Sequence, residues 1–176
     1  MTDEFGVTPW GRDWARLAQP TSITRPNPAI PRARSLARND CVGDLVLVAG
    51  SVTATVSLKR DYAVTLSCPP WTASEADLAR TLLVDAPSGD LPDSLHSEAA
   101  KSGLAVGPGK DELASTCTCT QRAKPCVHVL AVYFELARRI DEQPHLALTL
   151  RGLDRPTDET ASRIPIGRLD PASFYG

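Results

Sequence analysis

The sequence predicts an α+β fold in which a three-stranded antiparallel meander packs with several helices and a small metal-binding finger leads into the longest helix. Three observations support it. Residues 44–66 hold three short runs rich in β-branched residues, one of which alternates apolar and polar positions, whereas apolar residues in 127–140 recur every three or four positions. The chain has 176 residues, 42% of them hydrophobic and 23% charged, which is typical of one globular domain.

The meander is predicted from β-branched runs separated by short turns. The turns are expected at 49–51 and 58–61, and the runs read DLVLV, VTATV and YAVTL. In the second run Val52, Ala54 and Val56 point to one side while the residues between them point to the other. One face of this sheet is therefore expected to be buried and the other exposed to solvent.

Two short helices are expected before the meander. Thr8 is suited to cap a helix that starts at Pro9, and Trp10, Trp14 and Leu17 then share one apolar face. Four prolines between positions 20 and 31 predict an extended linker, after which 32–38 forms a small basic helix. The face with the two tryptophans is expected either to join the core or to contact a partner.

Helices dominate after the meander. We expect a helix over 72–84 capped by Thr72 or Ser74, a short helix after Pro92, and a long helix over 127–140 that Pro144 terminates. Residues 146–150 form a last apolar element that is either a helix or a strand. The organisation is thus a basic, proline-rich segment (1–40), the meander with helices (41–110), the finger with its following helices (111–152) and a flexible tail (153–176).

The net charge of −2 conceals two oppositely charged regions. Residues 10–39 carry six arginines and one aspartate, whereas residues 71–112 carry eight acidic and three basic residues. The total charge therefore neither requires nor excludes a nucleic-acid partner. No apolar run approaches the ~20 residues of a membrane span, and the N-terminus lacks a signal-peptide pattern, so we expect a protein of the bacterial cytosol or nucleoid with no membrane partner.

Four potential metal ligands lie within twelve residues of each other. Cys117, Cys119, Cys126 and His128 follow the spacing C-x-C-(x)6-C-x-H, and three thiols with one imidazole suit a closed tetrahedral zinc site. Residues two apart in an extended segment point the same way, so Cys117 and Cys119 are able to chelate together. A thiol redox pair is the alternative, but C-x-C lacks the two-residue spacer of thioredoxin-like motifs. Four protein ligands leave no open position for water, so we expect a structural zinc and no enzymatic activity.

This pattern, with its last two ligands opening an apolar helix, resembles the SWIM zinc finger over about residues 112–140. The wider chain is similar to a bacterial SWIM-domain family of actinobacterial type through Phe5-Gly6, Trp10-Gly11-Arg12 and Leu150-Arg151-Gly152. The resemblance implies one zinc ion held by the four ligands. It also implies a DNA-binding or protein-interaction role beside a SWI/SNF-type helicase. Val127 stands at a position that is often lysine in such proteins.

Two function hypotheses follow. In the first, the chain binds DNA or RNA through the basic residues Arg122, Lys124, Arg138 and Arg139, with the N-terminal arginines as further candidates. In the second, it is a protein-interaction adaptor that uses the Trp10/Trp14 face or the finger helix. Neither hypothesis includes a small-molecule substrate. Of the remaining candidates, Cys41 and Cys68 are expected to be small packed residues, and His96 and His145 are expected at the surface.

Overall fold

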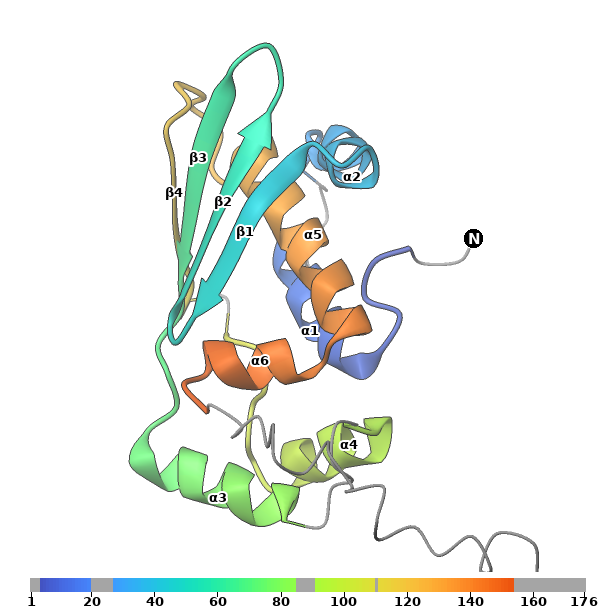
Figure 1. Cartoon of the computed structure of the whole chain (residues 1–176), viewed down its shortest axis with the longest axis vertical. Coiled ribbons are helices and arrows are strands. Elements are labelled where there is room, and N and C mark those ends of the chain that lie inside the picture. Colours follow the sequence, from blue (N-terminus) through green and yellow to red (C-terminus); the bar gives the residue numbers. More distant parts are fainter. Residues whose placement is uncertain (1–3, 20–26, 85–90, 110, 154–176) are drawn as a thin grey trace, which may run out of the picture.

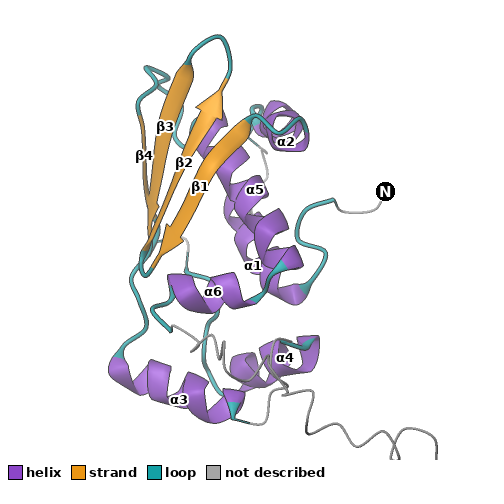
Figure 2. Cartoon of the chain, viewed as in Figure 1, coloured by secondary structure: helices purple, strands orange, loops and turns teal. Residues whose placement is uncertain are grey.

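The computed structural model describes residues 4–19, 27–84, 91–109 and 111–153, and the predicted tail lies outside them except for Leu153. The helices and strands are arranged as a sheet that covers one side of a long helix, with shorter helices around its other sides (Figures 1 and 2). In chain order they are α1 (Pro9–Ala18), α2 (Ile30–Arg38), β1 (Val42–Val48), β2 (Ser51–Ser57), β3 (Asp61–Ser67), α3 (Ala73–Leu83), α4 (Asp93–Lys101), β4 (Ala114–Cys117), α5 (Val127–Glu142) and α6 (His145–Leu150).

The α+β fold is confirmed, but the sheet has four strands where the sequence predicted three. The order is β1-β2-β3-β4 with antiparallel neighbours, and the fourth strand pairs Val64 with Cys117 and Leu66 with Ser115. This strand has no apolar alternation, because Ala114, Ser115 and Thr116 are all exposed. Backbone pairing with β3 and not burial of its own side chains makes it a strand.

The long helix α5 forms the centre of the core. Twelve of its sixteen residues are buried, because the inner face of the sheet covers one side and α1 and α2 cover others. A helix that is apolar on every side is expected only where neighbours surround it completely. Most of this helix is therefore unavailable as a partner surface.

The two N-terminal tryptophans also belong to the core. Thr8 caps α1 by accepting a hydrogen bond from the backbone of Gly11, and Pro9 occupies the first turn as predicted. Trp10 and Trp14 are each only 1% exposed. Of the two roles considered for this face, core packing is confirmed and the partner surface is wrong.

The segment before α1 is bound to the last turn of α5. The Asp141 carboxylate accepts hydrogen bonds from the backbone N–H groups of Gly6, Val7 and Thr8, at 2.7, 3.0 and 2.8 Å, and from the Thr8 hydroxyl at 2.8 Å. Phe5 is only 4% exposed, and its ring centroid lies 5.2 Å from that of Phe134. The Phe-Gly motif of the sequence thus fixes the N-terminal segment on the core.

At the end of the molecule away from the β2–β3 turn, α3, α4 and α6 pack together (Figure 1). Thr72 and Glu75 form a capping box at the start of α3, and the undecided apolar element 146–150 is helical. His96 is not simply at the surface as predicted, because its Nε2 lies 2.8 Å from the Asp13 carboxylate and ties α4 to α1. Within the described residues, none of the helices is both long and apolar enough to cross a membrane.

Candidate metal centre

The first two cysteines are positioned by the edge of the sheet. Cys117 ends β4 opposite the buried Val64, so its side chain points toward the interior and α5. The pairing continues one step further, because Thr118 donates its N–H to the Ala63 carbonyl and accepts the Ala63 N–H on its hydroxyl, both at 3.1 Å. Cys119 then lies on the same side as Cys117, as the two-residue period of extended backbone predicts.

The other two ligands are positioned by the start of α5. Cys126 is the N-cap residue of this helix and His128 lies in its first turn, and both are buried. The Cys126 side chain forms no capping hydrogen bond, so its sulfur stays available. The backbone N–H groups at a helix N-terminus carry partial positive charge, which favours a thiolate there.

The four side chains converge on one point. Their candidate ligand atoms, three sulfurs and one imidazole nitrogen, all lie within 4.8 Å of one another. His128 presents Nδ1 to the cluster, 3.7 Å from the Sγ atom of Cys117. Ordinary zinc–sulfur and zinc–nitrogen bond lengths in a tetrahedron place such atoms about 3.5–3.8 Å apart, so a small contraction brings the set to bonding geometry.

The protonation chemistry of the cluster also suits a divalent cation. Burial raises the pKa of Cys117 to about 12, and the neighbouring thiols oppose its ionisation. Burial also works against ionisation of Cys119, but hydrogen bonds from the Gln121 backbone and the adjacent thiols lower its pKa overall. For His128, burial lowers the pKa and the charges of Arg32 and Arg60 lower it further, which keeps the imidazole neutral and able to bind a metal. A 2+ ion bound here would supply the positive charge that allows several thiolates to coexist.

Comparison of the sequence with known protein families agrees with this geometry. Residues 103–137 match the sequence model of a family described as SWIM zinc finger. The chain contains a SWIM zinc finger. Its ligands Cys117, Cys119, Cys126 and His128 are positioned to bind one zinc ion, so the predicted cofactor and the predicted resemblance are confirmed.

A longer similarity extends to a protein with no described activity. The chain is 34% identical over 154 residues to the uncharacterized protein Rv2102 of Mycobacterium tuberculosis. The match covers 82% of this chain and 55% of that protein, so the chain spans about half the length of its curated relative. No solved structure matches the chain.

A second layer of side chains packs on the zinc ligand of α5. The Tyr62 ring stacks on the His128 ring with centroids 3.9 Å apart and planes 17° from parallel. The Arg60 guanidinium lies 5.1 Å from the Tyr62 ring centroid, and its Nε donates a hydrogen bond to the Tyr62 hydroxyl at 2.8 Å. Sequence reasoning missed this layer because Tyr62 and His128 belong to segments far apart in the chain. The aromatic residue at the start of a strand was the only local signal.

The predicted basic contacts separate into two groups. Arg122 and Lys124 are exposed in the loop of the SWIM finger between Cys119 and Cys126. Arg138 and Arg139 lie about 15 Å further along α5, given the rise of a helix. There both bind the buried Glu135 carboxylate, at 2.8 and 2.9 Å. Of these four predicted contacts, the structure therefore places only Arg122 and Lys124 beside the metal centre.

The remaining sequence candidates lie away from the SWIM finger or are single thiols. His145 is exposed at the start of α6, at the far end of α5, as expected for a surface residue. Cys68 is buried as predicted, whereas Cys41 is only half-buried, and both are free thiols.

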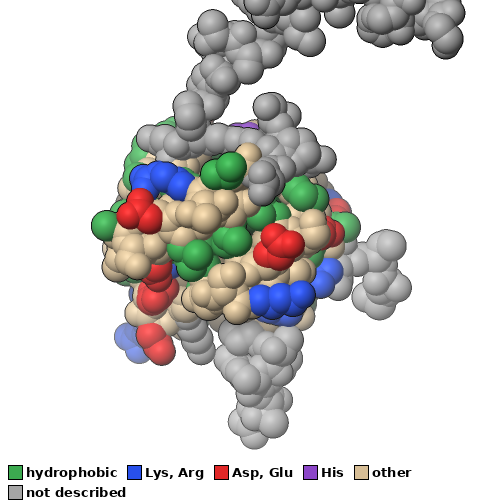
Figure 3. All heavy atoms as spheres, turned by 90° about the horizontal axis from the view of Figure 1, so that it is seen from below, with side chains coloured by type: hydrophobic (Ala, Val, Ile, Leu, Met, Phe, Trp, Pro, Cys, Tyr) green, Lys and Arg blue, Asp and Glu red, His purple; other side chains and the backbone are tan. Residues whose placement is uncertain are grey.

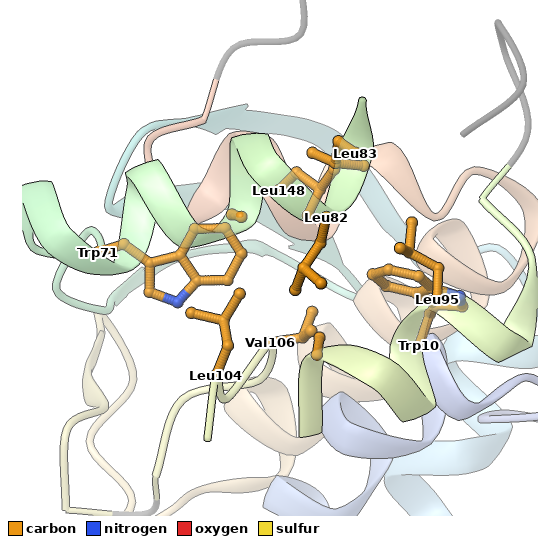
Figure 4. A pocket seen from close by; sticks show the side chains of 10 residues that line it. Trp10, Trp71, Leu82, Leu83, Leu95, Leu104, Val106 and Leu148 are labelled. Carbon is orange, nitrogen blue, oxygen red and sulfur yellow. The ribbon is translucent and has the colours of Figure 1, made fainter. Parts of the chain in front are cut away.

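A small apolar hollow separates α3 and α4 from the rest of the core. Hydrophobic side chains line it throughout, among them Trp10, Trp71, Leu82, Leu95 and Leu148 (Figure 4). Seen from this end, hydrophobic side chains gather between acidic and basic ones (Figure 3). No polar atom of the described residues is exposed in the hollow, and the indole N–H of Trp71 is bonded to the Ala105 carbonyl. The hollow thus offers a ligand apolar contact only.

Proposed function

We propose that this chain is a non-catalytic accessory module that binds the phosphate backbone of a nucleic acid on the surface around its zinc centre. The observation that carries the proposal is the position of Arg122 and Lys124, exposed within the loop that the zinc ligands enclose. No acidic side chain of the described residues forms an ion pair with either of them. Exposed cations without an ion-pair partner are available to displace counterions from a nucleic acid.

Zinc supports this function by shaping the surface. When bound, the ion supplies structural cross-linking between the edge of the sheet and the start of α5. Cys117 and Cys119 hold one end of the basic loop and Cys126 and His128 hold the other. Because four protein donors complete a tetrahedral site, we propose no catalytic role for the metal.

A helicase partner is part of the same proposal. It rests on the resemblance to bacterial SWIM proteins that work beside SWI/SNF-type helicases. A tagged full-length protein recovered with and without nuclease treatment tests it. We expect an ATPase of this class to be retained after nuclease, and its loss or absence would contradict a direct partnership.

Binding of labelled DNA and RNA by the zinc-loaded protein, followed by fluorescence anisotropy, tests nucleic-acid contact. We expect affinity to fall by about tenfold or more between about 50 and 200 mM salt, because each phosphate contact releases counterions. The double variant Arg122→Glu/Lys124→Glu is expected to lose most of this binding.

The matched control is Arg80→Glu/Lys101→Glu, which changes the net charge equally on exposed residues of α3 and α4. It is expected to bind almost as the wild type does. Absence of binding by the wild type at low salt would overturn the proposal, and equal losses in both double variants would reduce it to unspecific charge attraction.

The second candidate is a protein-interaction adaptor with a structural zinc and no nucleic-acid contact. One observation favours it: the outer face of the sheet is partly apolar. Val46 and Val48 are 56% and 55% exposed, and the register places Val46 beside Thr53, Thr65 and Thr116 in one row across the four strands. If this candidate is correct, partner recovery survives nuclease and a Val46→Lys/Val48→Lys variant abolishes it while leaving zinc content unchanged.

A further inference from the structure

The turn between β2 and β3 lies at the same end of the molecule as the loop of the SWIM finger (Figure 1). Its residues Lys59 and Arg60 are exposed, and the strands pair up to Ser57 and Asp61 on either side. This turn lies outside residues 103–137, which carry the SWIM match. Its place beside the zinc centre is a property of the fold and not of the finger motif.

The stack described above connects the turn physically to the metal. Arg60 lies over Tyr62, and Tyr62 lies flat on His128, whose Nδ1 faces the three sulfurs. A cation over an aromatic face and a ring stacked on a buried ring are both favourable contacts. The orientation of the turn therefore depends on the position of a zinc ligand.

The net charge of both loops is positive. The segment 57–62 contains Lys59, Arg60 and one acid, Asp61, while the segment 118–126 contains two cations and no acid. Within the described residues, Lys59 and Arg60 have no ion-pair partner. Arg32 of α2 adds a further cation close enough to influence His128. Cations contributed by separate loops suit a ligand with repeated negative charges, such as a nucleic-acid backbone, better than a single carboxylate.

We propose that Lys59 and Arg60 at the β2–β3 turn, together with Arg122 and Lys124 of the finger loop, form one binding surface for nucleic-acid phosphates. In this surface the Tyr62–His128 stack sets the position of the turn relative to the zinc centre. The inference rests on the proposed nucleic-acid function and adds a second loop and a positioning residue to it.

The charge test compares zinc-loaded wild type with Lys59→Ala/Arg60→Ala. Across a salt titration with labelled DNA we expect about a tenfold loss of affinity at low salt. We also expect the slope of log affinity against log salt to decrease by roughly one to two, because one or two phosphate contacts are removed. The control Arg80→Ala/Lys101→Ala is expected to leave both quantities nearly unchanged. Competition by polyglutamate as effective as that by DNA of equal charge would overturn nucleic acid as the ligand.

The positioning test leaves every charge in place. Tyr62→Leu removes the stack on His128, and we expect about a three- to tenfold weaker DNA affinity with one zinc still bound per chain. Tyr62→Phe retains the ring and loses only the Arg60 hydrogen bond, so its affinity is expected to lie between Tyr62→Leu and wild type. Unchanged DNA affinity in Tyr62→Leu with full zinc content would overturn the positioning role.

The outcomes separate the two proposals. If wild-type protein binds no nucleic acid, the proposed function and this inference fail together. If wild type binds, Arg122→Glu/Lys124→Glu loses binding and Lys59→Ala/Arg60→Ala does not, then the proposed function stands and the two-loop surface is wrong.

Discussion

The two ends of α5 are fixed by different chemistry. At its start, Cys126 and His128 meet Cys117 and Cys119 in a metal site. Near its end, the Asp141 carboxylate accepts four hydrogen bonds from the segment before α1. The metal site and the Asp141 hydrogen bonds each join α5 to a segment that the apolar side chains of α5 alone would not position.

The difference separates an end of α5 that depends on a metal ion from an end that depends on protein groups alone. The start of α5, with the metal site, lies beside exposed cationic loops. Its folded conformation depends on the binding of a single metal ion. The Asp141 end consists of protein groups only and lies among core residues such as Phe5 and Phe134. We therefore expect perturbations at the two ends to have separable effects, which the following predictions examine in order of decreasing size.

Zinc removal is expected to have the largest effect. Structural zinc contributes on the order of 10 kcal/mol to the folding of finger peptides. After chelation, hydrogen exchange is expected to accelerate strongly in β4, in the finger loop and in the first turn of α5. Amides of α1 and of the last turns of α5 are expected to stay protected, because Asp141 and the core still hold them.

Substitution of a single zinc ligand tests the same prediction without a chelator. Cys126→Ser is expected to lose zinc by elemental analysis and to reproduce the exchange pattern of the chelated protein. Cys41→Ser, at a half-buried free thiol outside the cluster, is expected to retain one zinc per chain. Equal loss of protection in α1 and in the finger would show that the two ends are not separable.

Loss of the Asp141 carboxylate is the next largest effect. Asp141→Ala leaves three backbone N–H groups without their acceptor, and we expect the free energy of unfolding to fall by about 3 kcal/mol. Asp141→Asn keeps one oxygen acceptor and is expected to lose less. Urea unfolding of the zinc-loaded protein measures both, and unchanged zinc content is the control that separates this end from the metal. A variant as stable as wild type would show that the hydrogen bonds to Asp141 contribute little.

A close approach of backbones beside Asp141 gives a smaller prediction. A Cβ atom at Gly11 would collide with Oδ1 of Asp141 and lie 2.7 Å from the Ala137 carbonyl oxygen. Gly11→Ala is therefore expected to lower the free energy of unfolding by about 2 kcal/mol, as overpacking does. Gly43→Ala is the matched control, because its Cβ would meet nothing within 4 Å. Equal unfolding midpoints of the two variants in urea would contradict the close approach.

Much of this arrangement could be predicted from local patterns. Alternation in β2 and the three- and four-residue spacing of Leu130, Phe134 and Ala137 in α5 reflect burial against one neighbouring layer. The metal ligands could be predicted because their spacing and chemistry are local. Thr8 and Pro9 likewise predicted the start of α1, because helix capping involves only adjacent residues.

What could not be predicted depends on contacts between distant segments. The strand β4 exists through pairing with β3, and nothing in Ala-Ser-Thr-Cys signals a strand. In the sequence, Asp141 is only one acid at a polar helix end. Its role follows from the hydrogen bonds that the Gly6–Thr8 backbone donates to it in the fold. In the sequence, Glu135 stands three and four residues before Arg138 and Arg139, a spacing that favours ion pairs along a helix. Burial of Glu135, which commits these arginines to ion pairs, became visible only in the structure.

The smallest predicted effect concerns the middle of α5, where Tyr133 lies under β4. Burial raises the pKa of Tyr133 to about 12, and a hydrogen bond with Ser115 only partly offsets it. The unfolded chain ionises near the ordinary value of about 10, so above that pH the unfolded state binds fewer protons than the folded state. Stability conferred by this residue is therefore complete below about pH 10 and is lost as the pH rises toward 12. At pH 11 the loss is about 1 kcal/mol.

Tyr133→Phe cannot ionise, so the difference in unfolding free energy between zinc-loaded wild type and this variant is expected to change by that amount between pH 9 and pH 11. A difference independent of pH would mean that Tyr133 is solvated, and that β4 is not closed over α5 at the metal end.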